Sequence, residues 1–308
     1  MVRFHPLLAY LRLSAARCLL AESARVYAVQ NIIAIIFDFD DTLAPDSTSG
    51  FLETLGLDVG SFWKHEVNPM LEQGWDPVPA YLYRMLELAR DGKAEITKAR
   101  LAQWGAQVPL YRGVKSLFSS LQKFVEAEQL DIALEFYLVS SGIGEILRAS
   151  SIADNFHDIW ACEFHYADTG VIEFPKRIVS FTDKTRYLFH IAKGIVGERY
   201  EGKPFEVNRK VPADQLRVPM NQMIFVGDGH TDVPCFSLVR NAGGTAIGVY
   251  DAERQDRWGR AWGFIEDNRV SNLVPADYGQ KSALVNSLKM AVGGIARNIA
   301  IRRSTYQG

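Results

Sequence analysis

The sequence contains few cysteines, and they lie far apart. Only three occur, at positions 18, 162 and 235. A small secreted domain held together by disulfides would carry more cysteines, in even number and at closer spacing. Their scarcity argues against a disulfide framework and predicts a protein of a reducing compartment, the cytoplasm.

The chain also lacks a long apolar stretch and an excess of charge of either sign. Its longest uncharged run, residues 26–37, is shorter than the roughly 20 apolar residues that a membrane-spanning helix needs. The 34 basic residues are balanced by 36 acidic ones, for a formal net charge of −2. Such a balance gives no general attraction to nucleic acid or to an anionic membrane. We therefore expect neither as a partner.

The first 30 residues differ in composition from the rest. They contain several arginines and a single acid, Glu22. Arg12 and Arg17 interrupt the apolar stretch that a secretory signal would need. An organelle transit peptide remains an alternative, but the simpler interpretation is an N-terminal helical extension over 1–30 that precedes a globular domain.

Short apolar runs alternate with helical patterns along the rest of the chain. Ile32–Phe37 is continuously apolar and is typical of a strand buried on both faces. Further strands are predicted at 136–139, 223–226, 245–249 and, more weakly, 159–164. Helices are predicted at 114–125, 143–149, 184–193 and 233–239. This alternation predicts an α/β fold with a doubly wound, Rossmann-like parallel sheet.

Two segments depart from this alternation. Residues 47–108 are helical in pattern and directly follow the first strand, so we expect a helical cap inserted into a core of residues 31–46 and 109–308. We call 47–108 the cap segment. Residues 167–181 resemble a hairpin, with Asp168-Thr169-Gly170 as its turn. Beyond it we expect a polar surface excursion at 197–219 and a final helix at 282–303.

Acidic motifs follow two of the predicted strands. The first strand runs into the sequence DFDDTL at 38–43, and the strand at 223–226 runs into GDGHTD at 227–232. Ligands of doubly wound sheets bind beyond the carboxyl ends of the strands. Neighbouring carboxylates suit a magnesium ion, a nucleophile with a general acid, or both. Either motif alone is a weak signal, since acids at strand ends are common.

A hydroxyl motif and a lysine complete the pattern. Ser140-Ser141-Gly142 follows the second strand where a helix starts, a position suited to binding phosphate oxygens. Lys184 lies near the first turn of the next helix. Its register, with apolar residues facing the core, favours it over the two alternatives, Lys176 and Lys193.

The chain thus carries an acidic motif, a hydroxyl motif, a lysine and a second acidic motif, in this order. The set resembles the four motifs of the haloacid dehalogenase superfamily of hydrolases. The resemblance covers roughly residues 31–249. Within that superfamily, the chain is similar to phosphoserine phosphatase and its relatives. Those proteins carry a helical cap between the first two motifs and a hairpin ahead of the lysine.

This resemblance implies a role for each motif residue. Asp38 would attack phosphorus and form an aspartyl-phosphate, and Asp40 would act as general acid and then general base. A Mg²⁺ ion would be held by Asp38, the backbone carbonyl of Asp40, and Asp228, with Asp232 a ligand through water or a partner of the ligands. Ser140 and Lys184 would complete the catalytic set. Substrate binding is assigned to Thr42, Ser140, Ser141, Gly142, Lys184 and His230.

The implied function is a magnesium-dependent phosphatase acting on a small phosphorylated metabolite. The acid at Asp40 favours phosphoester over carbon–halogen chemistry. A phosphotransferase and a non-catalytic binding protein of the same superfamily remain alternatives. In the cap segment, Trp63, Lys64 and Arg84 are expected to contact the leaving group. The aromatic residues there, Tyr81 among them, could line the site or form the segment's own core. His230 could instead have a structural role.

Overall fold

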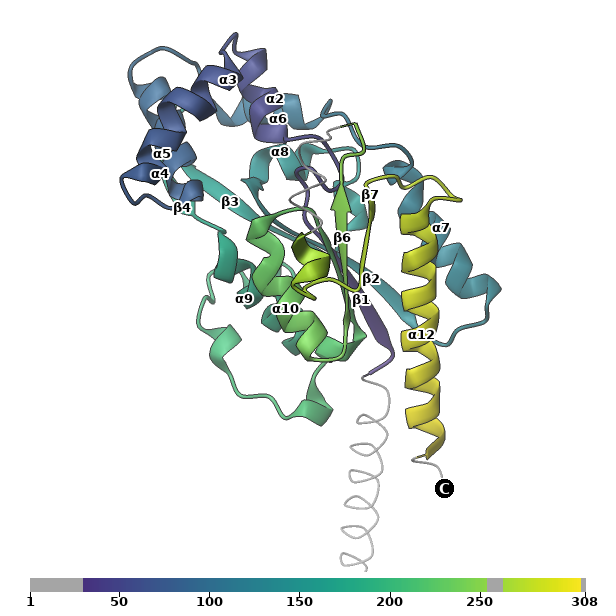
Figure 1. Ribbon diagram of the computed structural model, residues 1–308. Coiled ribbons are helices and arrows are strands. Elements are labelled where there is room, and N and C mark those ends of the chain that lie inside the picture. The colour runs from purple at the N-terminus through teal and green to yellow at the C-terminus, as the bar shows by residue number, and fades with distance from the viewer. Residues whose placement is uncertain (1–29, 254–262, 306–308) are drawn as a thin grey trace, which may run out of the picture.

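A seven-stranded sheet forms the centre of the protein (Figure 1). The computed structural model describes residues 30–253 and 263–305, so the predicted helix over 1–30 lies almost wholly outside the described residues. The strand order is β4-β3-β2-β1-β5-β6-β7, and all neighbours are parallel except β3 and β4. The strands are β1 (Ile32–Phe37), β2 (Ala133–Ile143), β3 (Asp158–Tyr166), β4 (Ile172–Arg177), β5 (Met223–Gly227), β6 (Thr245–Tyr250) and β7 (Asn272–Pro275).

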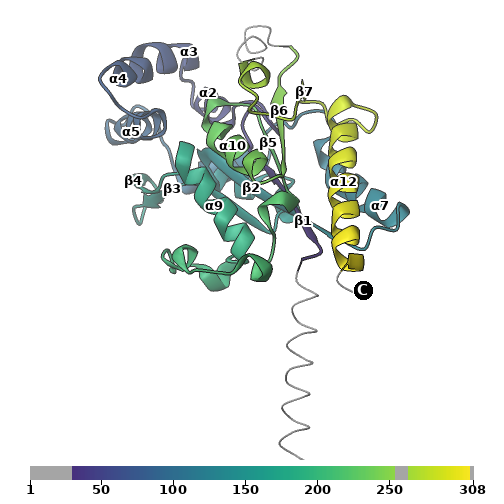
Figure 2. The ribbon, with the colours of Figure 1, turned by 60° about the horizontal axis from the view of Figure 1, so that its bottom comes forward.

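Helices cover both faces of this sheet, as the predicted doubly wound fold requires. On one face lie α9 (Phe181–Lys193) and α10 (Val233–Asn241); on the other lie α7 (Val114–Ala127) and α12 (Ala283–Thr305) (Figures 1 and 2). From residue 33 to residue 37, β1 is fully buried, which explains its apolar composition. Among the described residues, no helix combines the length and apolarity needed to cross a membrane.

Three parts of the sheet differ from the prediction. β2 continues to Ile143, so Ser140-Ser141-Gly142 lies within the end of this strand and does not follow it. The hairpin lies earlier than 167–181: it consists of β3 and β4, and the predicted turn lies between them, with Gly170 at φ +83°. Phe181 instead begins α9. The strand β7 was not predicted because it has four residues, of which only Val274 is buried.

The cap segment contains five α-helices that lie over the carboxyl ends of the strands (Figure 1). They are α2 (Ser47–Thr54), α3 (Val59–Ser61), α4 (Asn68–Glu72), α5 (Pro77–Arg90) and α6 (Lys98–Gly105), with a π-helical turn at Phe62–Val67. α6 packs against α8 (Gly144–Ala149). A Cβ at Gly105 would lie 2.2 Å from the carbonyl oxygen of Ile146, so glycine permits this close approach.

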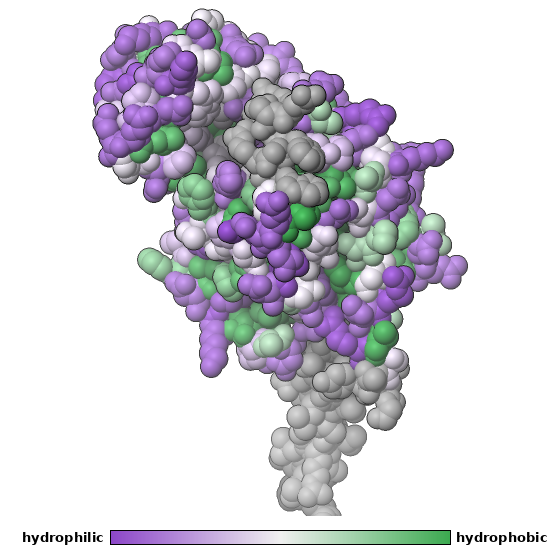
Figure 3. All heavy atoms as spheres, in the orientation of Figure 1, coloured by the Kyte–Doolittle hydropathy of each residue, from purple (hydrophilic) through white to green (hydrophobic). Residues whose placement is uncertain are grey.

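The hairpin holds the cap segment at a second place. Thr97 forms a bridge with Val171 in the hairpin turn, and the Ile172 N–H donates to the Ile96 carbonyl at 3.1 Å. The base of the cap segment is thus tied to the core by α8 and by the hairpin. Figure 3 shows largely hydrophilic side chains over the cap segment on the face in view.

The excursion at 197–219 consists of short 3-10 turns joined by irregular chain. Its end is anchored to the sheet by Arg217, whose guanidinium forms hydrogen bonds with the carboxylate of Glu135 and, at 3.2 Å, with the hydroxyl of Tyr137. Both partners lie on β2. This contact explains how a polar segment stays packed against the core.

Candidate active site

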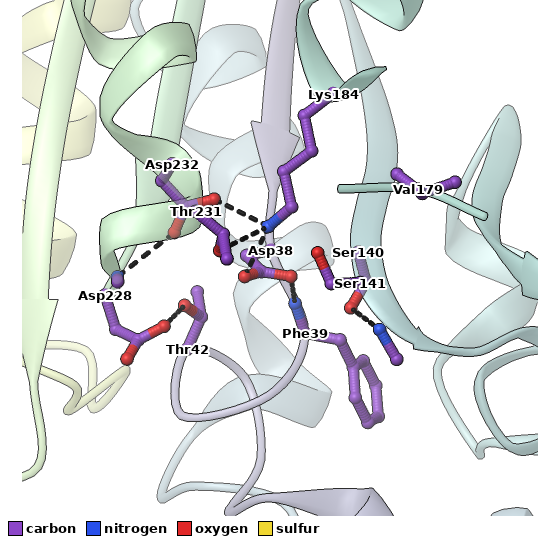
Figure 4. A network of polar contacts seen from close by, with 12 residues as sticks. Asp38, Phe39, Thr42, Ser140, Ser141, Val179, Lys184, Asp228, Thr231 and Asp232 are labelled. Atoms are coloured by element: carbon purple, nitrogen blue, oxygen red, sulfur yellow. Dashed lines mark hydrogen bonds and ion pairs between the residues drawn. The ribbon is translucent and has the colours of Figure 1, made fainter. Parts of the chain in front are cut away.

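Asp38 lies where β1 ends, at the centre of the sheet. Its backbone N–H donates to the carbonyl of Val226 at 2.9 Å, which continues the pairing of β1 with β5. The side chain is almost completely buried. One carboxylate oxygen accepts the Phe39 N–H at 2.7 Å and the other accepts the ammonium of Lys184 at 2.7 Å (Figure 4). The Asp38 carboxylate is therefore held in a single orientation.

Lys184 is fully buried in the first turns of α9. Its ammonium contacts Asp38 and Asp232, each at 2.7 Å, and the Thr231 hydroxyl at 3.3 Å. Burial alone lowers the pKa of a lysine, but the two carboxylates outweigh it and raise the pKa of Lys184 above its ordinary value. Lys184 is therefore a permanent cation in the site.

The two alternative lysines lie elsewhere. Lys176 pairs with Glu163 at 3.6 Å. Lys193 donates to the carbonyls of Val207 and Arg209 at 2.6 and 2.8 Å. Neither forms a contact of this kind with Asp38, so the structure brings Lys184 to the position expected for the motif lysine.

Asp38, Asp228 and Asp232 form a cluster of carboxylates, with one oxygen of each within 4.8 Å of the others. Burial, followed by the neighbouring charges of Asp232 and Asp38, raises the pKa of Asp228 well above its ordinary value. The Thr42 hydroxyl contacts Asp228 at 3.5 Å. An all-oxygen donor set with more negative charge than the single Lys184 balances suits a hard cation such as Mg²⁺.

Asp232 has a second role within this cluster. One of its oxygens binds Lys184, and the other accepts the Gly229 N–H at 3.1 Å. Burial raises the pKa of Asp232 to about 6, despite the opposing effect of Lys184. Both oxygens are therefore already engaged by the protein, which favours Asp232 as a support for the site over a direct metal ligand.

The side chain of Asp40 is not part of this cluster. Its carboxylate accepts the N–H of Ser47, the first residue of α2, at 2.7 Å. Burial and the nearby charge of Asp46 raise the pKa of Asp40 well above its ordinary value. The pKa of Asp40 is thus shifted in the direction that a general acid needs, and its carboxyl group lies on the side of the site nearest the cap segment. Of the four predicted metal-binding aspartates, Asp40 is the one whose side chain lies outside the carboxylate cluster.

Ser140 and Ser141 of the serine motif lie on the opposite side of Asp38 from Asp228 and Asp232, the two acids that follow β5 (Figure 4). The Ser140 side chain is buried, and its hydroxyl oxygen accepts the Gly142 N–H at 3.0 Å. The Ser141 hydroxyl oxygen is also buried, but it has no hydrogen-bond partner within 30–253 and 263–305. A Cβ at position 142 would lie 2.4 Å from the Asp40 carboxylate, so only glycine fits there.

Tyr81, on α5, connects the cap segment to this motif. Its hydroxyl donates to the Ser141 carbonyl at 2.6 Å, and its ring lies 5.9 Å from that of Trp63. Sequence reasoning gave Tyr81 no specific partner, because the contact joins residues 60 apart in the chain and depends on how α5 is oriented over the sheet.

Other predicted site residues have different surroundings. His230 is exposed, and its ring packs edge-on against Phe264 with centroids 5.6 Å apart, which fits the structural alternative. Lys64 is exposed. Arg84 is paired with Glu66 at 2.6 Å and also with Glu87; these two carboxylates already balance its charge within the cap segment.

The comparisons with known proteins agree with this arrangement. A family model of haloacid dehalogenase-like hydrolases matches residues 35–237, a range that includes Asp38, Ser140, Lys184, Asp228 and Asp232. A curated relative, an uncharacterized protein from Borreliella burgdorferi, is 28% identical over 284 residues, covering 83% of this chain and 95% of that protein.

Several solved structures share the fold at low sequence identity. A HAD family hydrolase from Salmonella enterica serovar Typhi has a TM-score of 0.53 at 14% identity, over 80% of this chain and 67% of that one. A probable phosphoserine phosphatase from Vibrio cholerae has a TM-score of 0.53 at 12% identity, over 87% and 66%. A phosphoserine phosphatase with a phospho-aspartyl intermediate analogue has a TM-score of 0.50 at 14% identity, over 84% and 99%. With the family match spanning the motifs, the chain belongs to the haloacid dehalogenase-like hydrolases.

Proposed function

We propose that this protein is a magnesium-dependent phosphatase that hydrolyses small phosphomonoesters through an aspartyl-phosphate on Asp38. The observation that carries the proposal is the Asp38 carboxylate, held by buried Lys184 beside the Asp228 carboxylate. A second carboxyl, that of Asp40, lies apart from this cluster and has a raised pKa. A nucleophile and an acid are thus kept in different electrostatic environments, as two-step ester hydrolysis requires.

The residues that would hold Mg²⁺ are Asp38, Asp228 and the backbone carbonyl of Asp40. When bound, the ion supplies positive charge that offsets the repulsion between an anionic nucleophile and a phosphate ester. Asp232 supports the site by fixing Lys184 and the Gly229 N–H.

The chain's own residues account for the two chemical steps. In the first, an Asp38 oxygen forms a bond to phosphorus while the ester oxygen leaves with a proton from Asp40. In the second, a water attacks the aspartyl-phosphate and Asp40 takes the water's proton. This releases phosphate and restores Asp38.

The phosphoryl oxygens would be received by Lys184 and by the Ser140 hydroxyl, whose oxygen accepts the Gly142 N–H at 3.0 Å. The buried Ser141 hydroxyl, which has no partner within the described ranges, is available for a further hydrogen bond to substrate.

We further propose that residues 47–108 act as a cap over this site. α2 begins at the hydrogen bond to Asp40, and α5 reaches the serine motif through Tyr81. A cap in this place excludes bulk water and admits small substrates. It would also place the leaving group beside Asp40 and the neighbouring aromatic residues.

A screen of purified protein against a panel of phosphorylated metabolites, with and without Mg²⁺, tests the proposed function. We expect metal-dependent phosphate release from at least one small monoester and none from the Asp38→Asn variant. Binding of phosphate without turnover of any ester would instead support a non-catalytic binding protein. Transfer of phosphate to an alcohol in place of water would support the phosphotransferase.

A further inference from the structure

We propose that Tyr81 is a positioning residue: its hydroxyl orients the peptide between Ser141 and Gly142, and so aims the Gly142 N–H at the Ser140 hydroxyl oxygen, which turns the O–H of Ser140 toward the phosphoryl group. This inference rests on the proposed function. It makes the cap segment responsible for the strength of phosphate binding as well as for access to the site.

The geometry of one peptide unit carries the inference. The Ser141 carbonyl and the Gly142 N–H belong to the same planar group and point in opposite directions. The Ser141 oxygen accepts the Tyr81 hydroxyl at 2.6 Å, and the Gly142 N–H points to the Ser140 hydroxyl oxygen at 3.0 Å. Fixing the oxygen therefore fixes the direction of the N–H.

This peptide needs such a restraint because it ends in glycine. Glycine adopts a wide range of backbone angles, and position 142 cannot carry a Cβ because of the Asp40 carboxylate. The Ser141 carbonyl is also contacted by the Cys162 thiol, at 3.3 Å. A thiol is a weak donor, which leaves the Tyr81 hydroxyl as the stronger of the two contacts.

Tyr81 is well suited to this task. Its side chain is 7% exposed, and burial together with the neighbouring Cys162 raises the pKa of its hydroxyl well above the ordinary value. It therefore remains a hydrogen-bond donor throughout the physiological pH range. Because Tyr81 lies on α5 and Ser141 on β2, movement of α5 away from the sheet would break the contact and release the peptide.

The competing interpretation is that Tyr81 forms a wall against the leaving group. The two roles differ in what they affect. A wall affects only those esters whose leaving group touches it. A residue that aims the Gly142 N–H affects every ester alike, and it affects inorganic phosphate, which has no leaving group.

Tyr81→Phe removes the hydroxyl and keeps the ring against Trp63. Tyr83→Phe is the matched control, because Tyr83 lies on the same helix and packs against Trp75, with ring centroids 5.1 Å apart. The measurements are the inhibition constant of inorganic phosphate and the kcat and KM of three esters with different leaving groups. For Tyr81→Phe, we expect the phosphate inhibition constant to rise by about tenfold and kcat/KM to fall by about tenfold for all three esters. Tyr83→Phe should stay within about twofold of wild type.

An unchanged phosphate inhibition constant in a folded Tyr81→Phe protein would overturn the inference, as would a loss confined to one ester. Thermal unfolding of each variant reports its folding. If Tyr81→Phe does not fold, Tyr81→Met, which also lacks the hydroxyl but keeps an apolar side chain beside Trp63, decides by the same measurements: an ester-independent loss supports the inference, and no change contradicts it. Failure of the wild type to hydrolyse any ester would instead refute the proposed function. Calorimetric titration with inorganic phosphate would then still compare the variants.

Discussion

The ammonium of Lys184 lies 2.7 Å from the carboxylate of Asp38, although the two residues are 146 positions apart in the chain. The same ammonium binds Asp232 at an equal distance. One buried cation thus neutralises part of the charge of a carboxylate cluster, and the remaining negative charge is available to a metal ion. We therefore expect Lys184 to stabilise the protein without metal and, by the same charge, to oppose metal binding.

Lys184→Met should lower the stability of the metal-free protein and strengthen its binding of Mg²⁺. Removing one partner of a buried ion pair costs about 3 kcal/mol of unfolding free energy, and a bound cation would replace part of the lost charge. Thermal unfolding at increasing Mg²⁺ concentration measures both effects, with Lys176→Met as the exposed control. Equal Mg²⁺-induced increases in Tm for Lys184→Met and wild type would contradict this account.

Asp38→Asn should abolish hydrolysis with little effect on folding. An amide is a poor nucleophile, so we expect kcat for a chromogenic phosphate ester to fall by at least about 10³-fold. Asp168→Asn, in the exposed hairpin turn, is a control with the same chemical change. Substantial turnover by a well-folded Asp38→Asn protein would remove Asp38 as the nucleophile.

Hydrolysis should require Mg²⁺, and Ca²⁺ should not replace it. Ca²⁺ accepts more ligands in looser geometry, which disturbs the alignment that in-line attack needs. Chelation should remove activity and added Mg²⁺ should restore it, while Asp228→Asn should raise the Mg²⁺ concentration needed for half-maximal rate by at least about tenfold. Full activity after exhaustive chelation would refute a metal role for Asp228.

Small phosphomonoesters should be hydrolysed at least about a hundredfold faster than folded phosphoproteins, because helices of the cap segment lie over the site. Phosphate release from a metabolite panel and from a phosphorylated protein, at matched phosphate concentration, measures this ratio. Comparable rates for both would mean that residues 47–108 do not restrict access.

The contact between Arg217 and Glu135 should make stability depend on pH. Burial raises the pKa of Glu135, but hydrogen bonds from Arg217 and Tyr137 outweigh it and hold the pKa below its ordinary value of 4.5. The pair therefore stabilises the fold above about pH 4.5 and loses this effect as the pH falls towards the lowered pKa.

Arg217→Met should cost about 2 kcal/mol of unfolding free energy at pH 7, and this difference should shrink below pH 4.5. Urea unfolding of wild type and variant at pH 7 and at a pH below 4.5 measures this difference. Arg303→Met, which removes one partner of an exposed ion pair, is the control. A difference that is the same at both pH values would exclude this carboxylate as its source.

Strands that are buried on both faces could be predicted from the sequence, and exposed strands could not. β1, β5 and β6 were predictable because strands buried on both faces have continuous apolar sequences. β4 has the sequence IEFPKR and only Ile172 is buried, so it carries no such signal. The hairpin turn was predictable from Asp168-Thr169-Gly170, but the extent of its strands depends on pairing that the local sequence does not encode.

In the site, too, residues that belong to local motifs could be predicted, and contacts that depend on tertiary packing could not. Asp38, Asp40 and Asp228 could be singled out because short motifs follow strands whose ends meet at one edge of the sheet. Choosing Lys184 over Lys176 required the register of a helix against the core. The contact between Tyr81 and Ser141 could not be predicted, because it depends on the orientation of the cap segment.

The hydrogen bond from the Asp38 N–H to Val226 also determines when the site can assemble during synthesis. β1 is made early, but it lies between β2 and β5, and β5 ends only at Gly227. At about 5–20 residues per second, roughly 10–40 s pass on the ribosome between the synthesis of Asp38 and the completion of β5. Nascent chains that end before Met223 lack both the strand that pairs with Asp38 and the acids that follow it. We therefore expect Asp38, the proposed nucleophile, to give a growing chain no activity until β5 has paired with β1 at the centre of the sheet.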